Sequence, residues 1–136
     1  MGNKVYLDTN IVADIIDSSR NNHRASLRLL KYLVMQDYMI HISEDMLTTL
    51  YYISKDKKQT LTFFKNLIFI DWEVLTFSLK IIKQATEVSL EKNVDLEDVL
   101  QCLCAKENGC KILITNDKKF YDCGINIMTV KDFCKK

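Results

Sequence analysis

Three aspartates stand at positions from which they could act together, although they lie far apart in the 136-residue chain. Asp8 comes directly after the apolar run at residues 5–7, Asp117 comes shortly after the run at residues 112–114, and Asp98 lies in a third acidic stretch. Carboxylates without histidine or thiol partners suit a hard cation such as Mg²⁺ or Mn²⁺. Such an ion polarises a phosphate and lowers the pKa of bound water, so this set predicts phosphodiester hydrolysis.

The two apolar runs predict buried strands of a parallel sheet. In open α/β sheets, ligands bind outside the carboxyl ends of the strands. Asp8 and Asp117 would therefore reach the same edge of the sheet. Each could instead cap the helix or turn that follows it, because aspartate is a common N-cap residue.

The third acidic stretch places Asp95, Glu97 and Asp98 at the start of a predicted helix. One helical turn puts Asp95 and Asp98 on the same side. A capping box is the structural alternative, with Asp95 as N-cap and acids that complement the helix dipole. The arrival of three acidic stretches at one sheet edge favours a metal site.

The remaining pattern alternates strands with helices, which predicts an α/β sandwich with a mainly parallel sheet of four or five strands. No proline, only three glycines and no linker-like stretch occur, so residues 1–136 are expected to form a single domain. Gly109 is expected at the C′ position of a helix. Strands are predicted near residues 5–7, 38–42, 69–75, 111–115 and 125–130, before a polar tail, and helices near 11–17, 23–36, 43–53, 61–67, 78–91 and 95–108.

Composition sets broad limits. The chain is 48% hydrophobic and 27% charged with a net charge of +1, which is ordinary for a globular protein and makes no case for nucleic acid or membrane binding. A neutral total still permits local charged patches. No signal-peptide pattern is present and no apolar run approaches the roughly 18 residues of a membrane helix, so a soluble cytoplasmic protein is expected.

The five cysteines are odd in number, and no C-x-x-C spacing occurs. The two histidines are far apart in sequence. A zinc site or a disulfide framework is therefore not expected, and reduced, mostly buried thiols are.

Basic residues offer a weaker signal for RNA. Arg20, Arg24 and Arg28 repeat at four-residue spacing, so on one helix they would share a face that could follow an RNA backbone. A solvated helix face is the more ordinary interpretation. Lys118, next to Asp117, could contact substrate phosphates.

Three stretches of the chain form a pattern when they are taken together in order and spacing. They are Leu7-Asp8-Thr9-Asn10, Leu96-Glu97-Asp98-Val99-Leu100-Gln101 leading into Cys104-Ala105-Lys106, and the run from Gly109 to Phe120 that contains Thr115-Asn116-Asp117. With these stretches the chain resembles the PIN domain family. The resemblance implies a three-layer α/β/α fold and a metal-dependent ribonuclease that cleaves RNA. Many members are toxins of bacterial toxin–antitoxin pairs of the VapC type, so the resemblance also implies an antitoxin partner and a homodimer.

By this resemblance, the family's acids fall on Asp8, Asp98 and Asp117. These three would hold Mg²⁺ or Mn²⁺ and serve as the catalytic residues. Asn10 and Asn116 would lie near the metal.

One departure concerns a glutamate that the family commonly carries on the helix after the second strand. This chain has Thr49 at that position. Glu44, Asp45 or Glu97 could compensate, or the metal could be held more weakly, or the site could be degenerate. The alternative function is accordingly a catalytically degenerate PIN-like module that binds RNA or a partner protein. A phosphotransferase of the haloacid-dehalogenase type is disfavoured, because those enzymes need a second aspartate where Asn10 stands.

Overall fold

The computed structural model describes residues 3–135 and contains a five-stranded sheet with strand order β3-β2-β1-β4-β5. Every neighbouring pair of these strands is parallel. The predicted α/β fold with a mainly parallel sheet of four or five strands is confirmed. The strands are β1 (Lys4–Leu7), β2 (Met39–Ser43), β3 (Glu73–Leu75), β4 (Ile112–Ile114) and β5 (Asn126–Met128).

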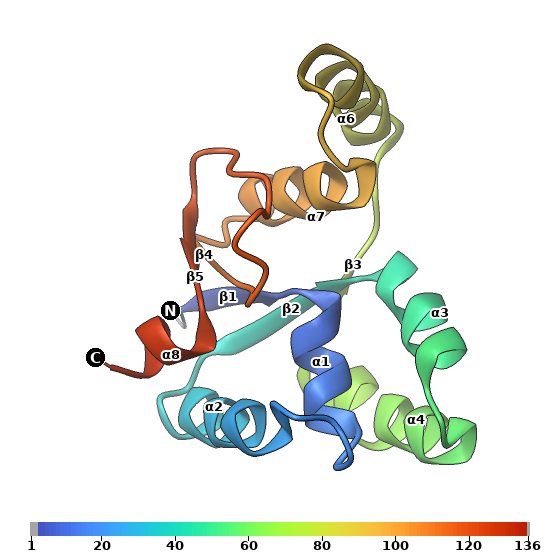
Figure 1. Cartoon of the computed structure of the whole chain (residues 1–136), viewed down its shortest axis with the longest axis vertical. Helices are drawn as coiled ribbons and strands as arrows, with labels where there is room; N and C mark the ends of the chain where they lie inside the picture. Colours follow the sequence, from blue (N-terminus) through green and yellow to red (C-terminus); the bar gives the residue numbers. More distant parts are fainter. Residues whose placement is uncertain (1–2, 136) are drawn as a thin grey trace.

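Helices cover both faces of the sheet (Figure 1). On one face lies α7, with α6 packed outside it, and on the other lie α1 and α2, with α8 against α2. The three-layer arrangement is as expected. None of the helices within residues 3–135 is long and apolar enough to cross a membrane. The helical segments are α1 (Thr9–Ile16), α2 (His23–Met35), α3 (Glu44–Ile53), α4 (Lys57–Phe63), the π-helical η1 (Phe64–Ile68), α5 (Phe69–Asp71), α6 (Leu79–Lys92), α7 (Leu96–Glu107) and α8 (Val130–Cys134).

The central position of β1 follows from its sequence. Val5, Tyr6 and Leu7 are all fully buried. A strand that is apolar at consecutive positions must be covered on both faces, which the helical layers provide. The core therefore surrounds the strand that leads into Asp8.

The strand predicted from residue 69 was placed too early, because β3 begins at Glu73. The preceding residues continue the helical path of α4, η1 and α5. Phe64, Ile68 and Trp72 follow one another at four-residue intervals, and all three are buried. This helical spacing of buried side chains, rather than the local apolar run, decides the structure of the segment.

The end of the chain was predicted to be a polar tail, and it contains α8 instead. Thr129 is the N-cap, and its Oγ1 accepts a hydrogen bond of 3.1 Å from the Asp132 amide. Val130 and Phe133 are buried one helical turn apart. The cap and this pair together explain why a helix forms in so short a segment.

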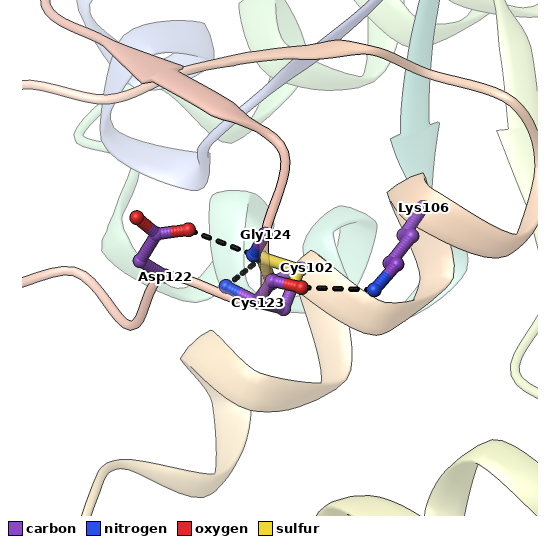
Figure 2. Close-up of a disulfide and its surroundings, with 5 residues drawn as sticks. All are labelled: Cys102, Lys106, Asp122, Cys123 and Gly124. Carbon is purple, nitrogen blue, oxygen red and sulfur yellow. Dashed lines mark hydrogen bonds between the residues drawn. A yellow bond between two sulfur atoms is a disulfide. The ribbon is translucent and has the colours of Figure 1, made fainter.

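A disulfide joins Cys102 to Cys123, so the prediction that the cysteines stay reduced was wrong for this pair. Cys102 lies on α7, and Cys123 lies in the loop that leads to β5 (Figure 2). Because β5 pairs with β4, this loop returns along α7, and a sequence spacing of 21 residues gives no sign of that proximity. Cys104 and Cys110 are buried free thiols, and Cys134 is an exposed one.

Polar contacts also hold the loop that carries Cys123 against α7. Lys106, one turn after Cys102, donates a 3.0 Å hydrogen bond from Nζ to the carbonyl oxygen of Cys123. The Asp122 carboxylate accepts a 2.8 Å bond from the Gly124 amide, and φ of Gly124 is +103°. Figure 2 shows both contacts beside the disulfide. The helix that carries Asp98 and the loop after Asp117 are thereby fastened together.

Candidate active site

The register between β1 and β4 brings Asp8 next to Thr115. Leu7 pairs with Ile114, and the Asp8 amide donates a 3.0 Å hydrogen bond to the carbonyl oxygen of Ile114. Thr115 then donates from Oγ1 to Oδ2 of Asp8 over 2.8 Å. The other Asp8 oxygen accepts from the Thr9 amide over 2.7 Å, so Asp8 also caps α1. Both carboxylate oxygens are thus held in place.

The hydroxyl of Thr115 also reaches Asp117. The Asp117 amide donates to Oγ1 of Thr115 over 3.1 Å. Asp117 Oδ1 accepts from the Lys119 amide over 2.9 Å, as expected for an aspartate that caps a turn. One hydroxyl therefore connects the backbone of Asp117 with the side chain of Asp8.

Asp98 comes to this edge from α7. Asp95 is the N-cap of that helix and accepts a 3.1 Å hydrogen bond from the Asp98 amide. The capping interpretation thus holds for Asp95, and the cap fixes where Asp98 stands in the first turn. Asp98 itself is half-buried.

Electrostatics show that the three aspartates share one environment. Burial raises the pKa of Asp98 to about 7, and the negative charges of Asp95, Asp8 and Asp117 add to the shift in that order. Burial also raises the pKa of Asp8, against the hydrogen bonds from Thr115 and Thr9 that lower it. Carboxylates that repel one another in this way gain most from a bound cation.

A further carboxylate, that of Asp45, reaches the cluster from α3 and lies near Glu97 of α7. Burial, followed by the charge of Asp45, raises the pKa of Glu97. Asp45 accepts a 2.5 Å hydrogen bond from the Ser43 hydroxyl, and the buried Tyr6 hydroxyl lies 2.6 Å from the same Ser43 oxygen. This chain of hydroxyl groups starts on the central strand β1 and ends at the Asp45 carboxylate.

Thr49 stands at the position of the missing glutamate and supplies no carboxylate. The Thr49 hydroxyl donates back to the carbonyl oxygen of Asp45 over 3.4 Å, within its own helix. Glu44 is exposed in the first turn of α3. Of the three acids that could compensate, Asp45 and Glu97 are the two that the fold brings together.

Asn10 and Arg20 meet beside this edge. Arg20 donates from Nε to the buried Asp14 carboxylate over 2.6 Å and from Nη2 to Asn10 Oδ1 over 3.3 Å. Arg20 precedes α2, which begins at His23, so the prediction that three arginines could share one helix face was wrong. The Asp14 carboxylate turns Arg20 toward α1 instead.

The other sequence-predicted groups lie around the same edge. Arg24 and Arg28 are exposed one turn apart on α2. Lys118 is exposed and lines a groove of about 470 Å³ with Asp117. Asn116 accepts a 3.1 Å hydrogen bond from the Val130 amide, which ties it to the start of α8.

Gln101 is a neighbour that sequence reasoning missed. Its Nε2 donates to Thr9 Oγ1 over 3.1 Å, and the side chain is 1% exposed. Within the described residues its Oε1 has no partner. Its position one helical turn after Asp98 was the available signal, because residues three apart on a helix share a side.

The donor set fits a hard divalent ion by its chemistry. The acidic groups are all carboxylates, with no imidazole or thiolate between them. Burial, and then the charges of neighbouring carboxylates, raise the pKa values of Asp8, Glu97 and Asp98. Within residues 3–135, no three acidic, histidine or cysteine side chains already stand in ligand geometry. The arrangement is therefore a cluster of oxygen donors whose mutual repulsion a cation would relieve.

Three solved structures share this fold. VapBC2 from Rickettsia felis, solved with a promoter DNA fragment, matches with a TM-score of 0.68 and 23% identity over 93% of this chain and 98% of that chain. VapC20 from Mycobacterium tuberculosis, described as a sarcin-ricin loop cleaving toxin, gives a TM-score of 0.72 and 15% identity over 89% and 95%. A toxin–antitoxin complex from Klebsiella pneumoniae gives 0.71 and 19% over 93% and 97%.

Sequence comparison identifies the family. The chain is 38% identical to Ribonuclease VapC1 of Aquifex aeolicus over 137 aligned positions, which cover 98% of this chain and 94% of that protein. The model of the PIN domain matches residues 5–126, a span that includes Asp8, Asp98 and Asp117. The predicted resemblance is confirmed, and the chain belongs to the PIN domain family.

Proposed function

We propose that the protein is an endoribonuclease that depends on Mg²⁺ or Mn²⁺ and acts as the toxin of a toxin–antitoxin pair. The observation that carries the proposal is the convergence of Asp8, Asp98 and Asp117 on one sheet edge, where their charges act on one another. The 38% identity to a protein named Ribonuclease VapC1 supports the reaction type. A cytoplasmic location, where RNA is abundant, belongs to the same proposal.

Asp8, Asp98 and Asp117 would hold the ion. When bound, the ion would polarise the scissile phosphate and lower the pKa of a water molecule. The residues of the chain keep these acids in position: Thr115 orients Asp8, and the Asp95 cap fixes the turn that carries Asp98. Such supporting hydrogen bonds matter because they fix the direction of each ligand.

Asp45 and Glu97 would supply the negative charge that the missing glutamate gives other family members. The support is their closeness to each other and the effect of Asp8 on Glu97. Asp45 is also held by the Ser43 hydroxyl, so its carboxylate is oriented before any ion arrives. Asn10, Asn116 and Lys118 would then contact the RNA or water around the ion.

Cleavage of labelled single-stranded RNAs of varied sequence, with and without added Mg²⁺ or Mn²⁺, tests the proposal. Metal-dependent products are expected from the wild type, and Asp98→Asn should reduce their rate by about 100-fold or more, as removal of one charge-stabilising group does in other enzymes. Glu87→Gln, an exposed acid on α6, is the matched control and should cleave normally. Equal rates for Asp98→Asn and wild type would refute the proposal.

A catalytically degenerate module that binds RNA or a partner is the second candidate. Thr49, whose hydroxyl bonds within its own helix, is the observation that favours it. Calorimetric titration with Mn²⁺ separates the two functions. Absence of binding at millimolar ion would support the module, and saturable binding lost in Asp8→Asn would support the nuclease.

An antitoxin partner and a homodimer complete the proposal. Two of the similar structures are described as VapBC2 and as a toxin–antitoxin complex, which supports a partner of that kind. Co-expression with the product of the neighbouring gene should yield a complex in which RNA cleavage is suppressed. Light scattering of the purified protein should give twice the mass of 15.9 kDa expected for one chain.

A further inference from the structure

A groove of about 690 Å³ lies between α2 and α8 and begins at Asn116, the residue before Asp117. Its charged lining residues are Arg28, Lys131 and Lys135, and all three are exposed. Among its described lining residues there is no carboxylate. The groove is therefore cationic, although the chain as a whole is almost neutral.

The neighbouring groove at Asp117 has the opposite character. Asp122 and Asp132 line it together with Asp117, against the single cation Lys118. The positive charge of the α2–α8 groove is also not cancelled by ion pairing, since the ion pair found within residues 3–135 is the one between Arg20 and Asp14. An acidic edge and a basic groove thus lie side by side.

The wall of the basic groove is fixed to the acidic edge. The Val130 amide at the start of α8 donates to Asn116 Oδ1 over 3.1 Å. On the inner side of α8, the Phe133 ring meets Tyr32 of α2 edge to face, with 5.7 Å between ring centroids. Tyr32 also lines the groove and is only half-buried, so part of the side chain remains accessible.

We propose that the α2–α8 groove binds the phosphate backbone of single-stranded RNA next to the cleavage site. Arg28, Lys131 and Lys135 would contact successive phosphates, and Tyr32 would lie within reach of a base. The strand would then pass Asn116 and present its next phosphodiester to the acids at the sheet edge. This inference rests on the proposed function, which makes RNA the occupant of a groove whose lining includes Asn116, the residue before Asp117.

Binding can be measured apart from cleavage. Fluorescence anisotropy of a labelled single-stranded RNA of about 12 nucleotides, in a chelator that prevents metal-dependent cleavage, measures RNA binding without cleavage. Three phosphate contacts on a single strand predict that log K falls with log salt with a slope of about −2. The double variant Arg28→Glu/Lys131→Glu should weaken binding by about 10-fold or more and make the slope shallower by about 1.4.

The matched control is Lys80→Glu/Lys83→Glu, which makes the same kind of charge change at exposed positions of α6. It should change affinity by less than about twofold, and both variants should keep the circular dichroism spectrum of the wild type. Equal binding by the two double variants would overturn the inference. So would a groove variant that keeps its RNA affinity but loses an acidic protein partner.

Asp98→Asn distinguishes this inference from the proposed function. It should bind RNA like the wild type in chelator and yet fail to cleave with metal. Cleavage by the wild type together with unchanged RNA affinity in Arg28→Glu/Lys131→Glu would refute the groove and leave the nuclease standing. RNA binding through the groove without any cleavage would refute the nuclease and leave the groove.

Discussion

Thr115 and Asp8 are 107 positions apart in sequence, and their side chains are joined by a 2.8 Å hydrogen bond from a hydroxyl to a carboxylate. Both residues are at least nine-tenths buried. A buried carboxylate without such a donor would take up a proton more readily, because burial raises its pKa. The contact therefore keeps Asp8 available as an ionised ligand.

Thr115→Val removes this hydroxyl while keeping the shape of the side chain. We expect Mn²⁺ affinity and RNA cleavage to fall by about 10- to 100-fold, as with other residues that orient a metal ligand. Calorimetry and initial cleavage rates measure the two effects. Thr115→Ser keeps the donor and should retain most of both, so an equal loss in the two variants would contradict this role.

Asp45→Asn tests the carboxylate that would replace the missing glutamate. We expect weaker Mn²⁺ binding and about 10-fold slower cleavage, because the variant removes one charge from the cluster but keeps a hydrogen-bond acceptor for Ser43. Glu44→Gln, at the exposed neighbouring position, is the matched control and should behave as the wild type. Similar rates for the two variants would exclude Asp45 from the site.

The raised pKa of Asp98 predicts how stability changes with pH. Its folded pKa of about 7 lies above the ordinary value of 3.8, so the folded protein holds this proton more tightly than the unfolded chain does. The resulting stabilisation is complete below about pH 3.8 and is lost as pH rises through 7. In the absence of metal, Asp98→Asn should therefore melt higher than the wild type near pH 8, and the difference should be clearly smaller near pH 5.

Scanning calorimetry in chelator checks this expectation, with Glu87→Gln as the control that should track the wild type at both pH values. Added Mn²⁺ should stabilise the wild type near pH 8 and do so less near pH 6, because a protonated Asp98 is a poor ligand. A lower melting temperature of metal-free Asp98→Asn near pH 8 would contradict the prediction.

Cys102→Ser and Cys123→Ser test the disulfide. Under non-reducing conditions the unfolded wild type should show three free thiols of its five cysteines. Loss of a link that spans 21 positions should lower the free energy of unfolding by about 3 kcal/mol, as measured by urea denaturation. Cys134→Ser, at an exposed free thiol, should leave stability unchanged, and five free thiols in the wild type would contradict the link.

Local sequence signals predicted the parts of the fold that are decided locally. The apolar run at residues 5–7 identified the central strand, and Gly109, with φ of +81°, ends α7 as expected. The disulfide could not be predicted, because it depends on which loop returns along α7. The shift of β3 to Glu73 depends on burial at helical spacing, which becomes visible only once the packing is known.

In the candidate site, too, some residues could be predicted from local sequence signals and others depend on the packing of distant segments. Asp8, Asp98 and Asp117 could be named because each follows a recognisable strand end or helix start. The nearness of Asp45 and Glu97 depends on where the fold places the first turns of α3 and α7, and no spacing in the sequence encodes it. Arg20 does not share a helix face with Arg24 and Arg28, because its guanidinium group binds the buried carboxylate of Asp14.

The link between Cys102 and Cys123 closes a covalent ring that contains β4, Thr115 and Asp117, whereas Asp8 and Asp98 lie outside it. A protease that cut the chain once inside this ring would leave both pieces attached to each other. After a cut near Lys118, the piece that carries Asp98 and Asp117 would stay tethered to the piece that carries β5 and α8. In oxidising surroundings, a nick in the exposed turn near Lys118 would thus leave a molecule of unchanged mass, apart from one added water, until a reductant separated the two pieces.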